Sequence, residues 1–290
     1  MKKILHTSNS PLPILILILT LIAVPSAAQK KSIVILHLND THSRIEPLPE
    51  KNAQNAGKGG MARIYNYVEK VRQESDVLLF HCGDQVQGTP YFNFFNGKAE
   101  TAIANLLRYD AACLGNHEFD NGIEFLAEMV RMAKFPIIAT NLDFTGTAME
   151  GLTKKYHIIK KNGLKIGIIG LTIDFKELVS KSNSKGAKYL DPIKTANKTA
   201  EFLKNKEKCN LVIVLSHLGY YPKENKIGDT QLAEQSRNID LVLGGHTHTF
   251  MTKPVLCKNL DGKTVIINQT GAYGIFIGRV DIDFKLSHKK

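Results

Sequence analysis

The amino-acid sequence predicts an α/β fold in which short buried strands alternate with helices. Seven apolar runs have the composition of buried strands, and five segments between them show the apolar spacing of amphipathic helices. The chain has 290 residues, 43% of them hydrophobic and 22% charged, which excludes a disordered or fibrous protein and allows a large core. Together these observations favour sheets layered against helices.

The expected strands are short and largely unbroken by polar residues, as in sheets that are covered on both faces. In chain order they are Ser32–Leu38, Val77–Phe80, Ala111–Leu114, Pro136–Ala139, Lys165–Leu171, Leu211–Leu215 and Leu241–Leu243. Near the C-terminus, Thr264–Asn268 and Gly274–Phe284 predict a closing hairpin or edge strands.

The expected helices are Met61–Arg72, Glu100–Leu107, Gly122–Met132, Pro192–Lys204 and Thr230–Gln235. The start of the fourth is well defined, because Asp191 is a favourable N-cap residue and Pro192 suits the first helical position. Between the elements, Pro47–Gly60 and Lys176–Lys188 are polar and predict surface loops.

The chain is basic, with 38 Lys and Arg against 27 Asp and Glu and a formal charge of +11. The excess lies mainly in the expected loops and in the tail, where Lys289 and Lys290 end the chain. It does not follow one helix or alternate with aromatic residues, as a nucleic-acid groove requires. The charge therefore predicts a solvated surface that attracts anionic substrates, with no nucleic-acid partner.

Residues 1–28 have the pattern of a secretory signal peptide. Lys2 and Lys3 precede an apolar run of 11 residues from Ile14 to Val24, and Ser26-Ala27-Ala28 provides small residues for cleavage. The run is shorter than the roughly 20 residues that span a bilayer, so we expect no stable membrane insertion after cleavage. We therefore expect residues 29–290 to form one catalytic domain in a periplasmic or secreted protein.

The four cysteines do not have the spacing of a disulfide scaffold or a Cys-rich zinc module. Cys82 and Cys113 follow or lie within apolar runs, which predicts small core residues. Cys209 and Cys257 lie among polar residues, and their pairing stays open, because an exported protein meets an oxidising environment.

Polar side chains follow five of the expected strands at the point where each strand ends. The endings are Asn39-Asp40-Thr41-His42, Gly83-Asp84, Gly115-Asn116-His117-Glu118-Phe119-Asp120, Ser216-His217 and Gly244-Gly245-His246-Thr247-His248. Because ligands of α/β sheets bind beyond the carboxyl ends of the strands, we expect these residues to converge on one site.

This set of side chains is suited to divalent metal ions. It contains seven candidate ligands with nitrogen or oxygen donors and no thiolate, which favours Zn²⁺, Mn²⁺ or Fe²⁺: Asp40, His42, Asp84, Asn116, His217, His246 and His248. Seven ligands suffice for two ions that share a carboxylate, the arrangement of two-metal phosphoester hydrolysis. We expect Asp-x-His and His-x-His to be extended, so that both residues of each pair point to the same side.

The same motifs resemble those of the calcineurin-like metallophosphoesterases. LHLNDTHSRIEP at 36–47, GDQVQGTPYFNFFNG at 83–97, LGNHEFDNG at 114–122, LSHLGY at 215–220 and GGHTHT at 244–249 resemble the N-terminal catalytic domain of the bacterial 5′-nucleotidase family. The resemblance covers residues 32–284. It implies a metallophosphoesterase-type sandwich of two mixed β-sheets flanked by helices.

The resemblance also implies a role for each site residue. Asp40, His42 and His248 would hold one metal ion, Asn116, His217 and His246 the second, and Asp84 would bridge them. A metal-bound hydroxide would attack phosphorus, with Asn116 and His117 contacting the phosphate and Asp120 orienting His117. His37 and His81, inside expected strands, are predicted to be packed groups behind the site.

The implied function is an exported dimetal phosphohydrolase that acts on nucleoside 5′-monophosphates or related small-molecule phosphoesters, in nucleotide catabolism. The 5′-nucleotidase family usually carries a C-terminal substrate-recognition domain, and this sequence ends after the catalytic motifs. Two alternatives therefore stay open: a catalytic half that needs a separate partner protein resembling that domain, and a hydrolase of nucleotide sugars or cyclic nucleotides.

Overall fold

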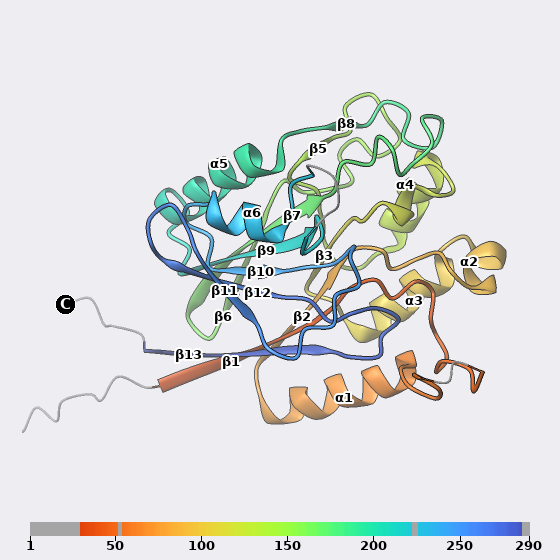
Figure 1. Cartoon of the computed structure of the whole chain (residues 1–290), viewed down its shortest axis with the longest axis horizontal. Helices are drawn as coiled ribbons and strands as arrows, with labels where there is room; N and C mark the ends of the chain where they lie inside the picture. Colours follow the sequence, from red (N-terminus) through yellow and green to blue (C-terminus); the bar gives the residue numbers. More distant parts are fainter. Residues whose placement is uncertain (1–29, 52–53, 222–225, 286–290) are drawn as a thin grey trace, which may run out of the picture.

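A computed structural model describes residues 30–285, except 52–53 and 222–225, as two β-sheets packed face to face with helices on both outer sides (Figure 1). The expected signal peptide at 1–28 lies outside the described residues. The prediction of two mixed sheets flanked by helices is confirmed, with a small two-stranded sheet in addition.

The first sheet has the strand order β13-β1-β2-β3-β4. All neighbours in it are parallel except β13, which pairs antiparallel with β1. Its strands are β1 (Lys30–Leu38), β2 (Val77–Cys82), β3 (Ala111–Cys113), β4 (Ile137–Ile138) and β13 (Gly278–Lys285).

The second sheet has the order β11-β12-β10-β9-β7-β6, with parallel pairing from β12 to β7 and antiparallel pairing at both edges. Its strands are β6 (His157–Lys161), β7 (Leu164–Thr172), β9 (Leu211–His217), β10 (Leu241–Leu243), β11 (Val255–Lys258) and β12 (Thr264–Asn268). The two-stranded sheet pairs β5 (Leu142–Asp143) with β8 (Lys188–Tyr189).

Helices cover the outer faces of both sheets (Figure 1). The first sheet is covered by α1 (Met61–Glu74) and α3 (Lys98–Leu107), with α2 (Pro90–Phe95) and α4 (Ile123–Met132) beside them. The second is covered by α5 (Pro192–Asn205) and α6 (Asp229–Glu234). The predicted cap of α5 is confirmed, because Asp191 accepts a hydrogen bond of 2.8 Å from the Lys194 N–H.

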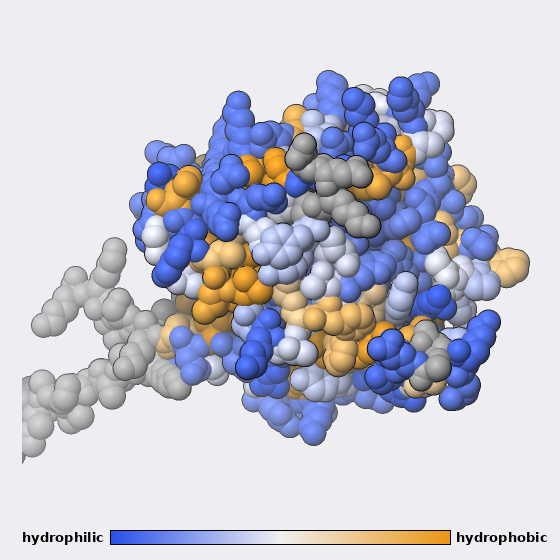
Figure 2. All heavy atoms as spheres, viewed as in Figure 1, coloured by the Kyte–Doolittle hydropathy of each residue, from blue (hydrophilic) through white to orange (hydrophobic). Residues whose placement is uncertain are grey.

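The core follows from the alternation of side chains along each strand. In β1, Ile33 and Ile35 point between the sheets, whereas Val34 and Leu36 pack against α1. The second sheet alternates in the same way, with Ile213 and Leu215 between the sheets and Val212 and Val214 under α5 and α6. Figure 2 shows an outer face that is mostly hydrophilic, with apolar patches near β11 and β12. The parallel strands therefore run through a closed core and expose only their ends.

The segments Thr264–Asn268 and Gly274–Phe284 do not form the predicted hairpin with each other: β12 pairs with β11 and β10 inside the second sheet, and of the two segments only the second forms an edge strand, β13. Cys82 and Cys113 are buried core residues, as predicted, and the structure, which describes all four cysteines, pairs none of them. His37 and His81 are buried in β1 and β2, also as predicted.

Candidate metal centre

The predicted ligand side chains come together at one edge of the double sheet. Asp40 and His42 follow β1, Asp84 follows β2, and Asn116 follows β3, all in the first sheet. From the second sheet, His217 ends β9, and His246 and His248 follow β10. The parallel strands β1, β2, β3, β9 and β10 end at the same edge, which is why residues far apart in the chain meet there.

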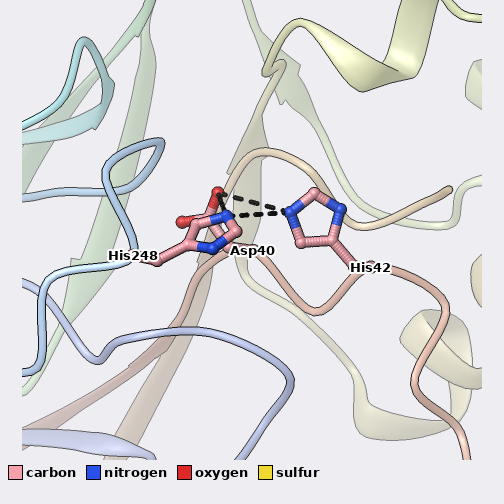
Figure 3. Close-up of side chains that lie close together, drawn as sticks. All are labelled: Asp40, His42 and His248. Atoms are coloured by element: carbon pink, nitrogen blue, oxygen red, sulfur yellow. Dashed lines mark hydrogen bonds and ion pairs between the residues drawn. The ribbon is translucent and has the colours of Figure 1, made fainter. Parts of the chain in front are cut away.

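One cluster consists of Asp40, His42 and His248, whose side chains point toward one another (Figure 3). The Nε2 atoms of His42 and His248 lie 3.0 Å apart, and His248 Nε2 lies 3.3 Å from Asp40 Oδ1. Asp40 and His42 are buried, and His248 is partly exposed. Two imidazoles and a carboxylate at these distances match the donor types and spacing of a divalent ion site.

The second cluster centres on Asp84. Asp84 Oδ2 lies 3.0 Å from His217 Nε2, and His246 Nδ1 lies 3.0 Å from Asn116 Oδ1. Asp84 Oδ2 also lies 3.9 Å from His42 Nε2, so Asp84, a member of the second cluster, reaches toward the first. A carboxylate in that position can be shared by two ions.

His217 shows that these residues fit a metal ion. Its Nδ1 lies 2.7 Å from the carbonyl oxygen of Cys82, which accepts the Nδ1 proton, and its buried Nε2 makes no well-aligned hydrogen bond within the described residues. An imidazole held by one nitrogen presents the lone pair of the other to a metal. Burial lowers the pKa of His217, but Asp84 and Asp40 outweigh burial and raise the pKa to about 10. The site therefore favours positive charge at Nε2.

The expected extended geometry of the ligand pairs is wrong. Asp40 and His42 have φ of 51° and 48°, Asp84 has 54°, and His246 and His248 have 73° and 50°. These are left-handed conformations, which non-glycine residues adopt rarely and which cluster at functional sites. The side chains converge because the backbone turns sharply after each strand, a feature that residue spacing does not reveal.

Two glycines allow the loops to approach one another closely. Gly83 has φ of +83°, and a Cβ there would lie 2.6 Å from the Gly115 nitrogen and 2.6 Å from His217 Nδ1. A Cβ on Gly115 would clash with the Asp84 carboxylate. Any side chain at either position would displace Asp84 or His217.

Glu118 is a supporting residue that the sequence analysis did not single out. Its buried carboxylate accepts hydrogen bonds from the backbone N–H groups of Asp84 (3.0 Å), Gln85 (2.7 Å) and Gly115 (2.6 Å). It thus ties the loop after β2 to the loop after β3. The available signal was an acidic residue directly after Asn116-His117 and before Phe119.

Asn39 supports Asp40 in a similar way. Its Nδ2 group donates to Asp40 Oδ2 at 2.6 Å, and its Oδ1 accepts from the Thr270 N–H at 3.0 Å. The side chain therefore fixes the carboxylate against the segment that follows β12.

His117 and Asp120 lie beside the two clusters. His117 Nδ1 lies 2.8 Å from Asp120 Oδ2, and the His117 ring centroid lies 5.3 Å from that of His42. The hydrogen bond to Asp120 raises the pKa of His117 to about 9 in spite of partial burial. A cationic imidazole at this position can stabilise an anion bound at the clusters.

The fold and this geometry define a class of metal-dependent phosphoesterases. The sequence profile of the calcineurin-like phosphoesterase family matches residues 33–250, and the chain belongs to that family. It is similar to the 5′-nucleotidase of Homo sapiens, with 34% identity over 280 residues, 89% of this chain and 47% of the human protein. It is also similar to the snake venom 5′-nucleotidase of Gloydius brevicauda, with 32% identity over 95% of this chain and 50% of the venom protein.

Solved structures agree with these matches. The 5′-nucleotidase precursor of Thermus thermophilus superimposes with a TM-score of 0.80 and 31% identity, over 88% of this chain and 52% of the other. The Haemophilus influenzae NAD nucleotidase gives a TM-score of 0.77 and 29% identity, over 89% and 54%. The chain thus spans about half the length of these relatives. Within the described part of the chain, no helix is long and apolar enough to cross a membrane.

Proposed function

We propose that the chain hydrolyses phosphoesters, with nucleoside 5′-monophosphates as the preferred class, at a centre of two divalent ions. The observation that carries the proposal is the pair of clusters that Asp84 connects, in each of which the His and Asp donor atoms lie within 4.8 Å of one another. Asp40, His42 and His248 would hold one ion, Asn116, His217 and His246 the other, and Asp84 both. Zn²⁺, Mn²⁺ and Fe²⁺ suit these donors.

The ions would activate water and neutralise charge on the phosphate. The chain's own residues position the substrate. His117 stands over the cluster that contains His42, where it stabilises the charge that builds on phosphorus oxygens, and Asp120 holds the imidazole ring in place through its bond of 2.8 Å. The Asn116 amide, beside His246, provides a further polar contact for the phosphate.

The test uses the purified full chain, stripped with a chelator and reloaded with Zn²⁺ or Mn²⁺. We expect metal-dependent phosphate release from adenosine 5′-monophosphate and from p-nitrophenyl phosphate, and about two metal ions bound per chain. A double variant, Asp84→Asn with His217→Ala, should lose both properties, whereas His157→Ala, on β6, should keep them. Undiminished turnover in the double variant would refute the dimetal assignment.

We also propose that residues 1–28 are removed during export and that residues 29–290 form the catalytic domain in the periplasm or medium. The sequence pattern supports this, since a charged start precedes a short apolar run and small residues. N-terminal sequencing of the exported protein should begin at Gln29. Recovery only from the cytoplasm, with Met1 or Lys2 at the N-terminus, would contradict it.

A second candidate function is a catalytic half that needs a separate protein to recognise nucleotides. The part that this chain matches is about half of each relative. Measuring kcat/KM for adenosine 5′-monophosphate and p-nitrophenyl phosphate on the purified chain separates the candidates. A strong preference for the nucleotide by the chain alone would dismiss the need for a partner.

A further inference from the structure

A cavity of about 420 Å³ lies next to the candidate metal centre, between the segment that follows β1 and the start of α2. Its walls include Arg44, Ile45 and Pro47 on one side and Tyr91, Phe94 and Phe95 on the other. None of these residues has a role in the site described above.

Hydrogen bonds connect the wall of the cavity to the loops that carry the expected ligands. Ser43, which directly follows His42, lines it, and the Ser43 carbonyl accepts a hydrogen bond of 2.9 Å from the Thr89 hydroxyl. The Ser43 N–H donates to the carbonyl of Gln85, next to Asp84, at 3.0 Å. A molecule whose phosphate lies at the metal centre would therefore have its other half directed to this cavity or to open solvent.

The cavity has the size and lining of a site for an aromatic group. Its volume lies within the roughly 300–1,000 Å³ typical of small-molecule sites. Phe94 is 78% exposed and Phe95 is 50% exposed, although aromatic rings are among the side chains that gain most from burial. The Tyr91 and Phe95 rings stack nearly parallel, at an interplanar angle of 25° and with centroids 6.4 Å apart, so α2 brings three aromatic rings, with Phe94, to the wall of the cavity. Figure 2 shows apolar side chains among hydrophilic ones at this corner of the molecule.

Arg44 links the cavity to the metal centre. Its guanidinium carbon lies 5.4 Å from the centroid of the Tyr273 ring, and its buried Nε has no hydrogen-bond partner among the described residues. The Tyr273 ring in turn lies 5.9 Å from that of His42 and 5.7 Å from that of His248. The positive charge of this guanidinium, held over the Tyr273 ring beside His42 and His248, attracts the oxygen atoms between a phosphate and its alcohol.

We propose that this cavity binds the nucleoside half of the phosphoester, the leaving group, with Arg44 positioning the ester oxygen and α2 providing the stacking surface. The proposal rests on the phosphoesterase function proposed above. It assigns to this chain a recognition surface of its own for nucleoside monophosphates.

A single tryptophan tests binding directly, because the chain contains none. In the full-length variant Phe94→Trp, loaded with Zn²⁺ or Mn²⁺, adenosine 5′-monophosphate should quench or shift the emission, and inorganic phosphate should not. The matched control is Phe202→Trp on α5, a position 38% exposed and far along the chain from the cavity, which should respond to neither. An unchanged emission from Phe94→Trp, or equal responses from the two variants, would overturn the proposal.

Kinetics provide a second readout. Phe94→Ala should raise KM for adenosine 5′-monophosphate about tenfold, near the lower end of one base–aromatic stack, and leave KM for glycerol phosphate within about twofold. Equal effects on the two esters would refute the cavity as a nucleoside site while leaving the phosphoesterase function intact. If the wild-type chain released phosphate from no ester, the proposed function itself would fail. A fluorescence response of Phe94→Trp only to an added second protein would also refute nucleoside binding.

Discussion

Acid should destabilise this protein through His37, a buried histidine of β1. His37 is 0% exposed, and neither ring nitrogen has a hydrogen-bond partner within the described part of the chain. It lies opposite Gly278 of β13 and Phe80 of β2 in the sheet. Burial alone lowers its pKa from 6.5 to about 3. The folded protein therefore holds His37 neutral at pH values where the unfolded chain binds a proton.

The direction and size of the stability change follow from the difference between the pKa of His37 in the folded protein and in the unfolded chain. A lowered histidine pKa contributes no penalty above pH 6.5, and stability is lost as the pH falls from 6.5 toward 3. At pH 5 the unfolded chain gains about 2 kcal/mol from protonating His37, and below pH 3 the loss approaches about 5 kcal/mol. The value at pH 5 depends only on the native pKa lying well below 5, which complete burial without a partner ensures.

Urea unfolding of the chelator-treated full chain at pH 8 and pH 5 measures the effect. The variant His37→Leu, similar in volume, should lose about 2 kcal/mol less than wild type between the two pH values. The pKa of His81 is lowered to a similar value, but His81 is present in both proteins, so its contribution cancels. His157→Leu, at a partly exposed histidine, should change the pH dependence less. An identical pH dependence in wild type and His37→Leu would refute the reasoning.

Three further predictions concern the site. His117→Ala should lower kcat for phosphate release at least about a hundredfold, because one group that stabilises transition-state charge is lost. Steady-state kinetics on the metal-loaded chain measure this change, and a much smaller decrease in kcat would contradict the role. Glu118→Gln replaces an acceptor of three backbone N–H groups with a side chain that is half donor, and chelator competition should show metal affinity reduced about 10- to 100-fold. Gly83→Ala should lower the free energy of unfolding by more than about 3 kcal/mol. Gly146→Ala is the control, at φ of +78° with no atom within 4 Å of the added Cβ, and should lower it by about 1 kcal/mol. Similar melting temperatures for the two variants would show that crowding at Gly83 is unimportant.

The central strands and main helices could be predicted from sequence because burial leaves a strong local pattern. The runs that form β1, β7 and β9 are apolar on both faces, as strands between a second sheet and helices must be. By contrast β6 and β11 are edge strands with partly exposed residues, and they resemble polar loops in sequence. The helix α2 is aromatic except for Pro90 and Asn93, so no separate apolar and polar faces mark it as a helix in sequence.

That these polar residues converge could be predicted from their types and positions, because polar side chains at the ends of parallel strands have few structural reasons to be there. The residues that hold these side chains in place could not be predicted. Glu118 and Asn39 act through backbone groups of other loops, and such bonds depend on how the two sheets face one another. No local pattern contains that information.

The candidate ligand residues in left-handed conformations explain why residue spacing wrongly predicted extended pairs. They also show which contacts stabilise the candidate metal centre. Each strained position costs of the order of 1 kcal/mol or more, so it persists only where other contacts outweigh it. Those contacts come from distant loops: the Asp40 N–H donates to the Gly83 carbonyl at 3.0 Å and the His42 N–H to that of Asp84 at 3.1 Å. Likewise the His246 N–H donates to Asp40 Oδ2 at 2.9 Å. These bonds join the loops that follow different strands, one of them from the second sheet to the first, and they stabilise the left-handed turns that direct the candidate ligand side chains toward one another.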